Sequence, residues 1–229
     1  MNHSWSICGA GGIDEHGIAG ASGVVADFAA LGIDAEERLR WQTVSTSPYA
    51  DFRRLDPTSK ALVLAAETID WSVLPQGDRQ HTAMLLGSEH GCLHTDLQFA
   101  ASLTGPGIAA GLFAFTLPST PLGVLALRHG LGGPTVALSL PMGRHHEVLQ
   151  HAGDLLTNGA AAACLCCFGD WLPTASALRR GRPPRTKMVA LLLAKGESTV
   201  PTAMPFAVPT GADAAATVLD FLRREHPRG

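Results

Sequence analysis

The sequence predicts an α/β fold, with a layered, mostly parallel sheet flanked by helices. Short apolar runs that do not alternate with polar residues are typical of strands covered on both faces. Between these runs lie segments with apolar residues at helical spacing. Apolar residues make up 46% of the 229 residues and charged residues only 16%, so the chain can bury a substantial core. The chain shows no second domain and no short-period repeat, and we expect one domain over residues 1–229.

Several short runs, rich in apolar or small residues and bounded by turn residues, are the expected strands. They are Ser4–Ile13, Thr82–Gly87, Val136–Leu140, Ala160–Phe168 and Met188–Ala194. Residues 20–50 have only weak periodicity, and we expect loops there with one short helix near Ala35–Trp41. Leu172–Lys187 is basic and contains adjacent prolines, which predicts an exposed loop. Val200–Pro209 holds further prolines and is expected to be irregular.

The clearest helix start is Asp56-Pro57. Aspartate at the N-cap accepts hydrogen bonds from the first free N–H groups, and proline at the next position lacks an N–H that would stay unpaired. The segment FAFTLPST, residues 113–120, is expected to be extended. Further helices are expected over Gly91–Leu103, from Pro121 to the turn at Gly130, after Met142, and over Ala212–Glu225.

Composition excludes several classes of function. The net charge of −3 gives no electrostatic reason to expect nucleic acid or an anionic membrane as a partner. No apolar run approaches the ~20 residues of a membrane helix, and the N-terminus lacks the pattern of a signal peptide. Cys164, Cys166 and Cys167 sit in one apolar run, as reduced core cysteines do, and alternate strand positions would separate them onto two faces. We therefore expect a cytoplasmic protein without a disulfide framework or a metal site.

The most informative stretch is the corner Pro141-Met142-Gly143, where an apolar strand turns sharply into a helix. Many folds place a reactive residue at such a corner, because the helix N-terminus favours negative charge. The residue at this corner is Met142, and a thioether has no proton to lose. His145 and His146 follow at the helix start, where polar residues need no catalytic explanation.

Four segments occur together in a familiar order. They are residues 52–67, 85–91, 115–135 and the helix from Arg144. From Phe52 onward the sequence resembles the N-terminal half of β-ketoacyl synthases, the condensing enzymes of fatty-acid and polyketide assembly. The strongest segment is FTLPSTPLGVLALRHGLGGPT, which is similar to the family's proline-containing segment, helix and G-L-x-G-P-S turn. The resemblance implies a single half of the thiolase fold.

Two departures from the family's pattern decide what the resemblance implies. The family's catalytic cysteine would fall on Met142, and the second half, which supplies two active-site histidines, is missing from this sequence. The thiolate is the species that attacks, so without it no acyl-enzyme can form. The resemblance therefore implies no catalytic residue in this chain and no cofactor.

The resemblance also implies two surfaces. In the family, the segment that matches Phe113, Phe115 and Thr116 reaches into the acyl pocket of a partner subunit, and Met142 would shape the same pocket. Ordinary core packing is the alternative for these side chains. The strand Val136–Leu140 is either internal or the edge that pairs antiparallel across the dimer axis, since an apolar edge left open would invite aggregation. The interface residues would then be Val136, Ala137, Leu138, Ser139 and Leu140.

The function that the resemblance implies is that of a catalytically inactive subunit, similar to a chain length factor. It would pair with an active β-ketoacyl synthase in fatty-acid, polyketide or polyene biosynthesis and shape that enzyme's acyl pocket. An acidic acyl carrier protein is a further expected partner, and a cluster of cations would suit it. The cluster comprises Arg179, Arg180, Arg182, Arg185 and Lys187.

Two alternatives belong to other classes. An independent acyl-thioester hydrolase or transferase could use Cys92 or Ser88, although GSEHG lacks the first glycine of the hydrolase elbow, where Leu86 stands. A homodimeric acyl-binding protein without a synthase partner is the other. A dinucleotide site at Gly9-Ala10-Gly11 is disfavoured, because the third glycine of that fingerprint would fall on Asp14.

Overall fold

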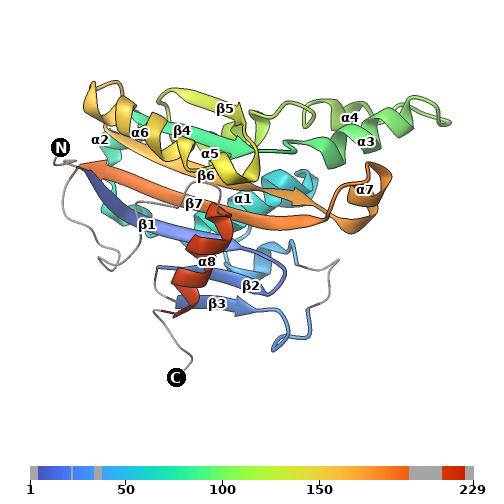
Figure 1. Cartoon of the computed structure of the whole chain (residues 1–229), viewed down its shortest axis with the longest axis horizontal. Coiled ribbons are helices and arrows are strands. Elements are labelled where there is room, and N and C mark those ends of the chain that lie inside the picture. Colours follow the sequence, from blue (N-terminus) through green and yellow to red (C-terminus); the bar gives the residue numbers. More distant parts are fainter. Residues whose placement is uncertain (1–4, 22, 34–37, 196–212, 225–229) are drawn as a thin grey trace.

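A single seven-stranded sheet forms the middle layer of the protein, with helices on both of its faces (Figure 1). The computed structural model describes residues 5–21, 23–33, 38–195 and 213–224. The strand order is β3-β2-β1-β7-β6-β4-β5. The strands are β1 Trp5–Ile13, β2 Gly17–Gly20, β3 Gly23–Asp27, β4 Thr82–Ser88, β5 Thr135–Ser139, β6 Ala163–Leu172 and β7 Arg185–Lys195.

The sheet is mixed and mostly antiparallel, so the prediction of a mostly parallel sheet is wrong. Strand β4 runs parallel to β5 and β6, and every other neighbouring pair is antiparallel. The connection from β6 to β7 contains one short helix, α7, Thr174–Arg179. A parallel neighbour would need a crossover that returns the length of β6, about 30 Å, and a helix that rises about 9 Å covers less than a third of it. Strand β7 runs back beside β6 instead.

Two segments predicted as loops contain regular structure. Residues 20–50 include β3 and the 3-10 turn Trp41–Thr43, and Leu172–Lys187 includes α7 and the start of β7. The strand predicted over Ser4–Ile13 is confirmed as β1, whereas β2 and β3 were not predicted. The glycines of β1 and β2 allow close packing. A Cβ atom on Gly11 would lie 2.2 Å from the carbonyl oxygen of Ala65, so no larger residue fits. The predicted helix near Ala35–Trp41 lies partly outside the described residues. The segment Val200–Pro209, predicted to be irregular, lies wholly outside them.

The predicted long helices are present within a few residues of the expected bounds. Asp56 caps α1 as expected, accepting hydrogen bonds from the backbone N–H groups of Thr58 at 3.0 Å and Ser59 at 3.2 Å. Helix α5 ends at Gly130, whose φ of +69° suits glycine. No helix in the described ranges is long and apolar enough to cross a membrane. The helices are α1 Pro57–Glu67, α2 Gln76–Arg79, α3 Leu93–Ser102, α4 Ala110–Phe113, α5 Thr120–His129, α6 Glu147–Thr157, α7 and α8 Ala214–Arg224.

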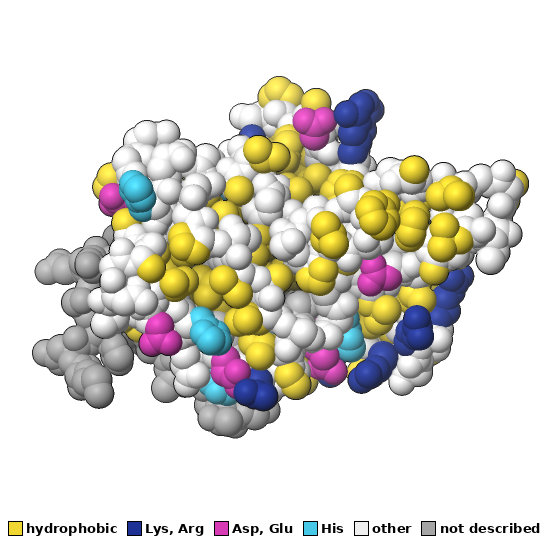
Figure 2. All heavy atoms as spheres, turned by 90° about the horizontal axis from the view of Figure 1, so that it is seen from above, with side chains coloured by type: hydrophobic (Ala, Val, Ile, Leu, Met, Phe, Trp, Pro, Cys, Tyr) yellow, Lys and Arg dark blue, Asp and Glu magenta, His cyan; other side chains and the backbone are white. Residues whose placement is uncertain are grey.

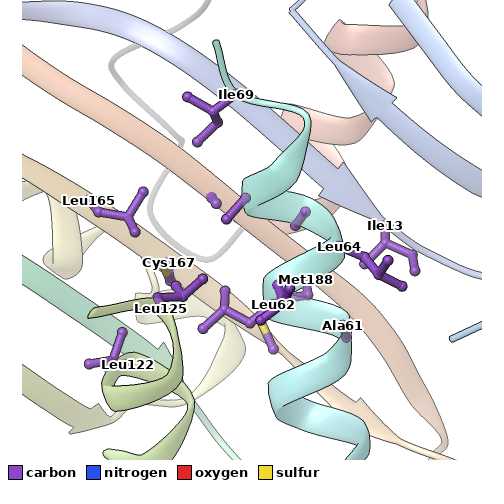
Figure 3. Close-up of a cluster of buried hydrophobic side chains, with 14 of the residues drawn as sticks. Ile13, Ala61, Leu62, Leu64, Ile69, Leu122, Leu125, Leu165, Cys167 and Met188 are labelled. Carbon is purple, nitrogen blue, oxygen red and sulfur yellow. The ribbon is translucent and has the colours of Figure 1, made fainter. Parts of the chain in front are cut away.

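The sheet separates two hydrophobic cores. Helices α1 and α5 cover one face, where Leu62 and Leu125 pack with Leu165 and Cys167 (Figure 3). Helices α6 and α8 cover the other face, where their apolar sides pack against the alternate residues of the same strands. Cys164 and Cys166 therefore lie in one core and Cys167 in the other, which confirms the predicted alternation.

A cluster of charged and aromatic side chains closes the contact between α1 and α5. Arg128 donates from Nε to Glu67 Oε1 at 2.8 Å and from Nη2 to Glu67 Oε2 at 3.2 Å. Its guanidinium also lies 4.9 Å from the ring centroids of Trp41 and Tyr49. We call this group, with the neighbouring His129 and Trp71, the α1–α5 cluster. It ties the segment around residue 41 to the helical layer.

Candidate functional site

The strongest candidate site lies where the parallel strands β4, β5 and β6 end. In α/β folds, ligands and reacting groups gather at the carboxyl ends of parallel strands, because loops from adjacent strands meet there. Ser88 closes β4, Met142 follows β5, and Asp170 lies near the end of β6. The parallel register pairs Gly87 with Phe168, so Ser88 comes opposite Gly169, one residue before Asp170.

Asp170 organises the turn after β4. The Ser88 hydroxyl donates to Asp170 Oδ1 at 2.5 Å, and the backbone N–H groups of His90 and Glu89 donate to the same carboxylate at 2.8 and 3.4 Å. The Ser88 hydroxyl accepts in turn from the backbone N–H of Gly91 at 2.7 Å. Both serine and carboxylate are buried, and their bonding is used to hold the turn. Sequence reasoning missed Asp170, although a charged residue inside the apolar run CCFGDWL is a signal of a buried, partnered carboxylate.

Met142 stands at the predicted corner, at the start of the 3-10 turn Met142–Arg144 that leads into α6. It is half-buried. Its backbone N–H donates to Glu89 Oε2 at 3.4 Å, and its sulfur contacts Nη1 of Arg185. A thioether can accept a weak hydrogen bond but cannot become a thiolate. The Met142 sulfur can therefore accept a weak hydrogen bond and pack against neighbours, but it cannot act as a nucleophile.

His145, one turn beyond Met142, is almost fully buried, with 1% of its surface exposed. Neither ring nitrogen has a hydrogen-bond partner within the described ranges. Burial lowers the pKa of His145; the carboxylates of Asp170 and Asp213 oppose this, as does the backbone of Leu140, which lies near without meeting hydrogen-bond geometry. The ring is therefore uncharged at neutral pH, unlike the solvated polar residue that the sequence suggested.

A cavity of about 460 Å³ opens beside His145 and Asp170. Its walls come from segments far apart in the sequence, among them the turn before α6, the end of β6, the start of β7 and the start of α8. Arg38 and Arg185 lie in its lining, and sequence analysis did not foresee their proximity to Met142. We refer to this space as the cavity.

Of the residues predicted for the acyl pocket, Met142 lines the cavity, whereas Phe113, Phe115 and Thr116 do not. FAFTLPST is not extended: Phe113 ends α4, and the following residues form helical turns, with Thr116 donating to the Phe113 carbonyl at 2.8 Å. Two threonine hydroxyls donate to preceding carbonyl oxygens here, and such bonds, together with the proline, favour turns over a strand. Phe113 is 61% exposed, whereas Phe115 packs partly into the core under α5. Their role toward a partner's pocket stays a prediction.

Strand β5 is the last strand of the sheet and pairs only with β4 among the described residues. Thr135, Val136, Ala137 and Ser139 are exposed, and Leu138 is half-buried. Because the outer side of β5 has no neighbouring strand in the described chain, its backbone groups on that side are open to pairing. Leu140 lies just beyond the strand and is buried in the core beneath α6.

The two candidate nucleophiles are poorly placed for attack. Cys92 is buried at the start of α3, its thiol lies 3.5 Å from the Leu117 carbonyl, and burial raises its pKa to about 12. The thiol is therefore protonated at neutral pH. The Ser88 hydroxyl donates to the Asp170 carboxylate and not to an imidazole, so no histidine base contacts it among the described residues. The described residues contain no group of three or more His, Cys, Asp or Glu side chains placed to hold a metal ion.

The basic segment is divided by the fold. Arg179, Arg180 and Arg182 are exposed, and Arg182 lies 3.6 Å from Glu89. Arg185 and Lys187 face the cavity instead. The segment therefore does not form one continuous surface of five cations.

No protein-family model matches the sequence, and no curated protein matches it. Solved structures do match the fold. The ishigamide ketosynthase/chain length factor aligns with a TM-score of 0.64 at 19% identity, over 84% of this chain and 62% of that chain. A ketosynthase in complex with its chain length factor from Xenorhabdus doucetiae aligns with a TM-score of 0.58 at 19% identity, over 84% and 79%.

A third match is a type II polyketide synthase acyl-carrier protein in complex with its ketosynthase, with a TM-score of 0.58 at 16% identity, over 83% of this chain and 62% of that chain. The chain thus spans less than two thirds of the length of two of these three structures. The similarity confirms the predicted resemblance at the level of fold: the chain has the thiolase-like fold of ketosynthase and chain length factor structures.

Proposed function

We propose that this chain is a catalytically inactive, ketosynthase-like subunit, similar in role to a chain length factor, that pairs with a separate, active β-ketoacyl synthase. The observation that carries the proposal is Met142, which stands at the strand-to-helix corner where the resemblance would place a cysteine. A methionine there cannot carry an acyl group. The chain can then contribute only shape and surface to fatty-acid, polyketide or polyene synthesis.

The side of the molecule formed by β5, α3 and α4 supports a partner surface. Hydrophobic side chains occupy much of the middle of this side, and most charged groups lie toward its borders (Figure 2). Large exposed apolar patches on soluble proteins commonly mark sites of contact with another protein. Large apolar side chains that are exposed here are Leu103, Ile108, Phe113, Leu117 and Val136.

The open edge of β5 supports pairing with a strand of the partner subunit. A partner strand can add to an exposed edge through backbone hydrogen bonds, with alternate side chains supplying specificity. In this arrangement Phe113, which projects from the end of α4, is placed to contact the partner together with the neighbouring Phe115 and Thr116. We infer that these side chains limit the partner's acyl pocket. Arg179, Arg180 and Arg182, which are exposed, are the cations available to an acidic acyl carrier protein.

Co-expression with the cognate synthase tests the proposal. We expect the two chains to purify together and the product length to change when Phe113 is replaced by alanine. Val136→Lys, on β5, should abolish co-purification, because a charge would be buried at the pairing edge. Val25→Lys is the matched control, since Val25 lies on β3 at the opposite edge and is 42% exposed, against 36% for Val136.

The outcome that contradicts the proposal is a monomer with no effect on products. Equal co-purification of Val136→Lys and Val25→Lys would contradict the assignment of β5 as the interface. An acyl group trapped on the isolated protein, and lost in Cys92→Ala or Ser88→Ala, would favour the hydrolase or transferase alternative instead. A reducing cytoplasm is the expected location, and the free, buried thiols of Cys92, Cys164, Cys166 and Cys167 fit it.

A further inference from the structure

Unpartnered nitrogen atoms gather around the cavity. Nε of Arg38, Nε of Arg185 and both ring nitrogens of His145 are buried, and none has a hydrogen-bond partner among the residues that the structure describes. All three side chains line the cavity. Buried polar atoms in native proteins are nearly always hydrogen-bonded, so several orphans around one space indicate a missing partner.

The unmet groups are mainly donors. A guanidinium Nε–H can only donate, and a neutral imidazole offers one donor and one acceptor. Arg185 uses Nη1 on the Met142 sulfur, but its Nε is not satisfied by this contact. The occupant that these donors fit is therefore rich in acceptors.

The carboxylates in the cavity wall, those of Glu15, Asp170 and Asp213, already have partners within the protein. Glu15 accepts from the Thr186 hydroxyl at 3.5 Å. Asp170 accepts from the Ser88 hydroxyl and the His90 backbone N–H. Asp213 accepts from the Ala216 backbone N–H at 3.0 Å and lies 3.7 Å from Nζ of Lys187. The cation of Lys187 is thus matched by an acid, whereas the two arginines have no ion-pair partner in the described chain at this site.

Size and lining indicate more than a bare ion. A volume of about 460 Å³ is within the range of pockets for small organic ligands. The polar groups share the cavity with an apolar wall. A ligand with a hydrocarbon part would therefore remove apolar surface from water both on itself and on this wall, which favours binding. The apolar lining comprises Met142, Trp171, Pro173, Pro184 and Ala215.

We propose that the cavity binds a small organic acid, with its carboxylate facing Arg38, Arg185 and His145 and its hydrocarbon part against Trp171 and the prolines. A carboxylate presents several lone pairs and accepts readily from arginine Nε–H and Nη–H groups together. This site is lined by residues of β6, β7 and α8 and by none of β5. The proposal therefore holds whether or not the chain pairs with a synthase.

Isothermal titration calorimetry of the full chain with octanoate, octanamide and inorganic phosphate tests the proposal. Octanoate should bind, and octanamide, which has the same chain without the charge, should bind at least ten times more weakly. Arg185→Gln and Arg38→Gln should each weaken octanoate binding about tenfold or more. Arg180→Gln is the matched control, because Arg180 is exposed and lies outside the cavity lining, and it should bind as the wild type does.

Nuclear magnetic resonance of histidine-labelled protein tests the position of the ligand independently of its affinity. The imidazole resonance of His145, assigned by its loss in His145→Gln, should shift when octanoate is added. Phosphate binding that matches octanoate and depends on the same arginines would assign the site to an oxyanion head and overturn the role of the hydrocarbon part. Equal binding of octanamide and octanoate, unchanged affinity in both arginine variants, or no binding of any probe would overturn the proposal.

Discussion

Two buried histidines show how differently this chain uses the same side chain. His129, in the α1–α5 cluster, stacks on Trp71 with ring centroids 4.1 Å apart. His145, at the other face of the sheet, adjoins an open cavity. Burial lowers the pKa of both rings. Tight aromatic packing around His129 indicates a structural role, whereas open space beside His145 indicates a role toward a ligand.

Acidification tests the packed histidine, His129, and should give the largest change in the free energy of unfolding. Burial lowers the pKa of His129 from 6.5 to about 3, with Arg128 and Arg79 adding to the shift. The unfolded chain therefore binds a proton that the folded chain refuses, so the stabilisation is complete above pH 6.5 and is lost as the pH falls toward 3. The loss is about 1.4 kcal/mol per pH unit at most. Urea unfolding at several pH values measures it, and His129→Gln should reduce the slope by about one proton.

Glu67 lies 3.5 Å from His129 Nε2 but not in hydrogen-bond geometry, and Arg128 already occupies this carboxylate. If Glu67 instead held a charged His129, the folded chain would bind the proton more tightly than the unfolded chain, and the wild type would lose less stability with acid than His129→Gln. A wild-type slope equal to or smaller than that of His129→Gln would therefore contradict the packed, uncharged histidine.

Removal of the cation from the α1–α5 cluster should have the next largest effect. Arg128→Met would leave Glu67, whose side chain is 14% exposed, without its two hydrogen bonds, and would remove the contacts with Trp41 and Tyr49. We expect a loss of about 2 kcal/mol in the free energy of unfolding, because the remaining carboxylate is largely buried. Urea denaturation measures it.

Arg54→Met is the control for that measurement. Arg54 also pairs with an acid, Asp51, at 3.4 Å, but both side chains are about 70% exposed or more. Water screens such a pair, and the change should stay below about 0.5 kcal/mol. Similar losses for the two variants would show that Arg128 acts only as a surface charge.

Replacement of the cavity histidine should have the smallest effect, and of opposite sign. His145→Phe removes two buried ring nitrogens that lack partners in the described chain, and the new ring would face Phe168, whose centroid is 6.4 Å from that of His145. We expect the free energy of unfolding to rise by about 1 kcal/mol. Thermal unfolding of the two proteins gives the comparison. A clear loss of stability would mean that the His145 nitrogens are bonded within the protein.

The sequence predicts local features well and assembled features poorly. The start of α1 follows from Asp56-Pro57 alone, and β4 follows from an apolar run, because each is decided by neighbours in the chain. The direction of β7 depends on the length of the connection before it, which an apolar pattern does not report. Glycine-rich β2 gives no strand signal, since its glycines serve close packing.

The same limit applies to the site. The corner at Met142 was predictable, since a strand, a turn and a helix follow one another there. Arg38, Asp170 and Arg185 could not be placed beside it from sequence, because only the folded sheet brings their segments together. The resemblance to the ketosynthase family found the fold but gave no signal for this cavity.

The order of the strands has a consequence for how the protein is made. Strand β1 ends at Ile13, yet its neighbour β7 begins only at Arg185, and β7 then separates β1 from β6 in the finished sheet. On the ribosome, β1 and β6 must each wait with an unpaired apolar edge until β7 emerges. Pairings over such a distance form slowly. We expect the nascent chain to depend most on chaperones, and to aggregate most readily, in the interval just before residues 185–195 leave the exit tunnel.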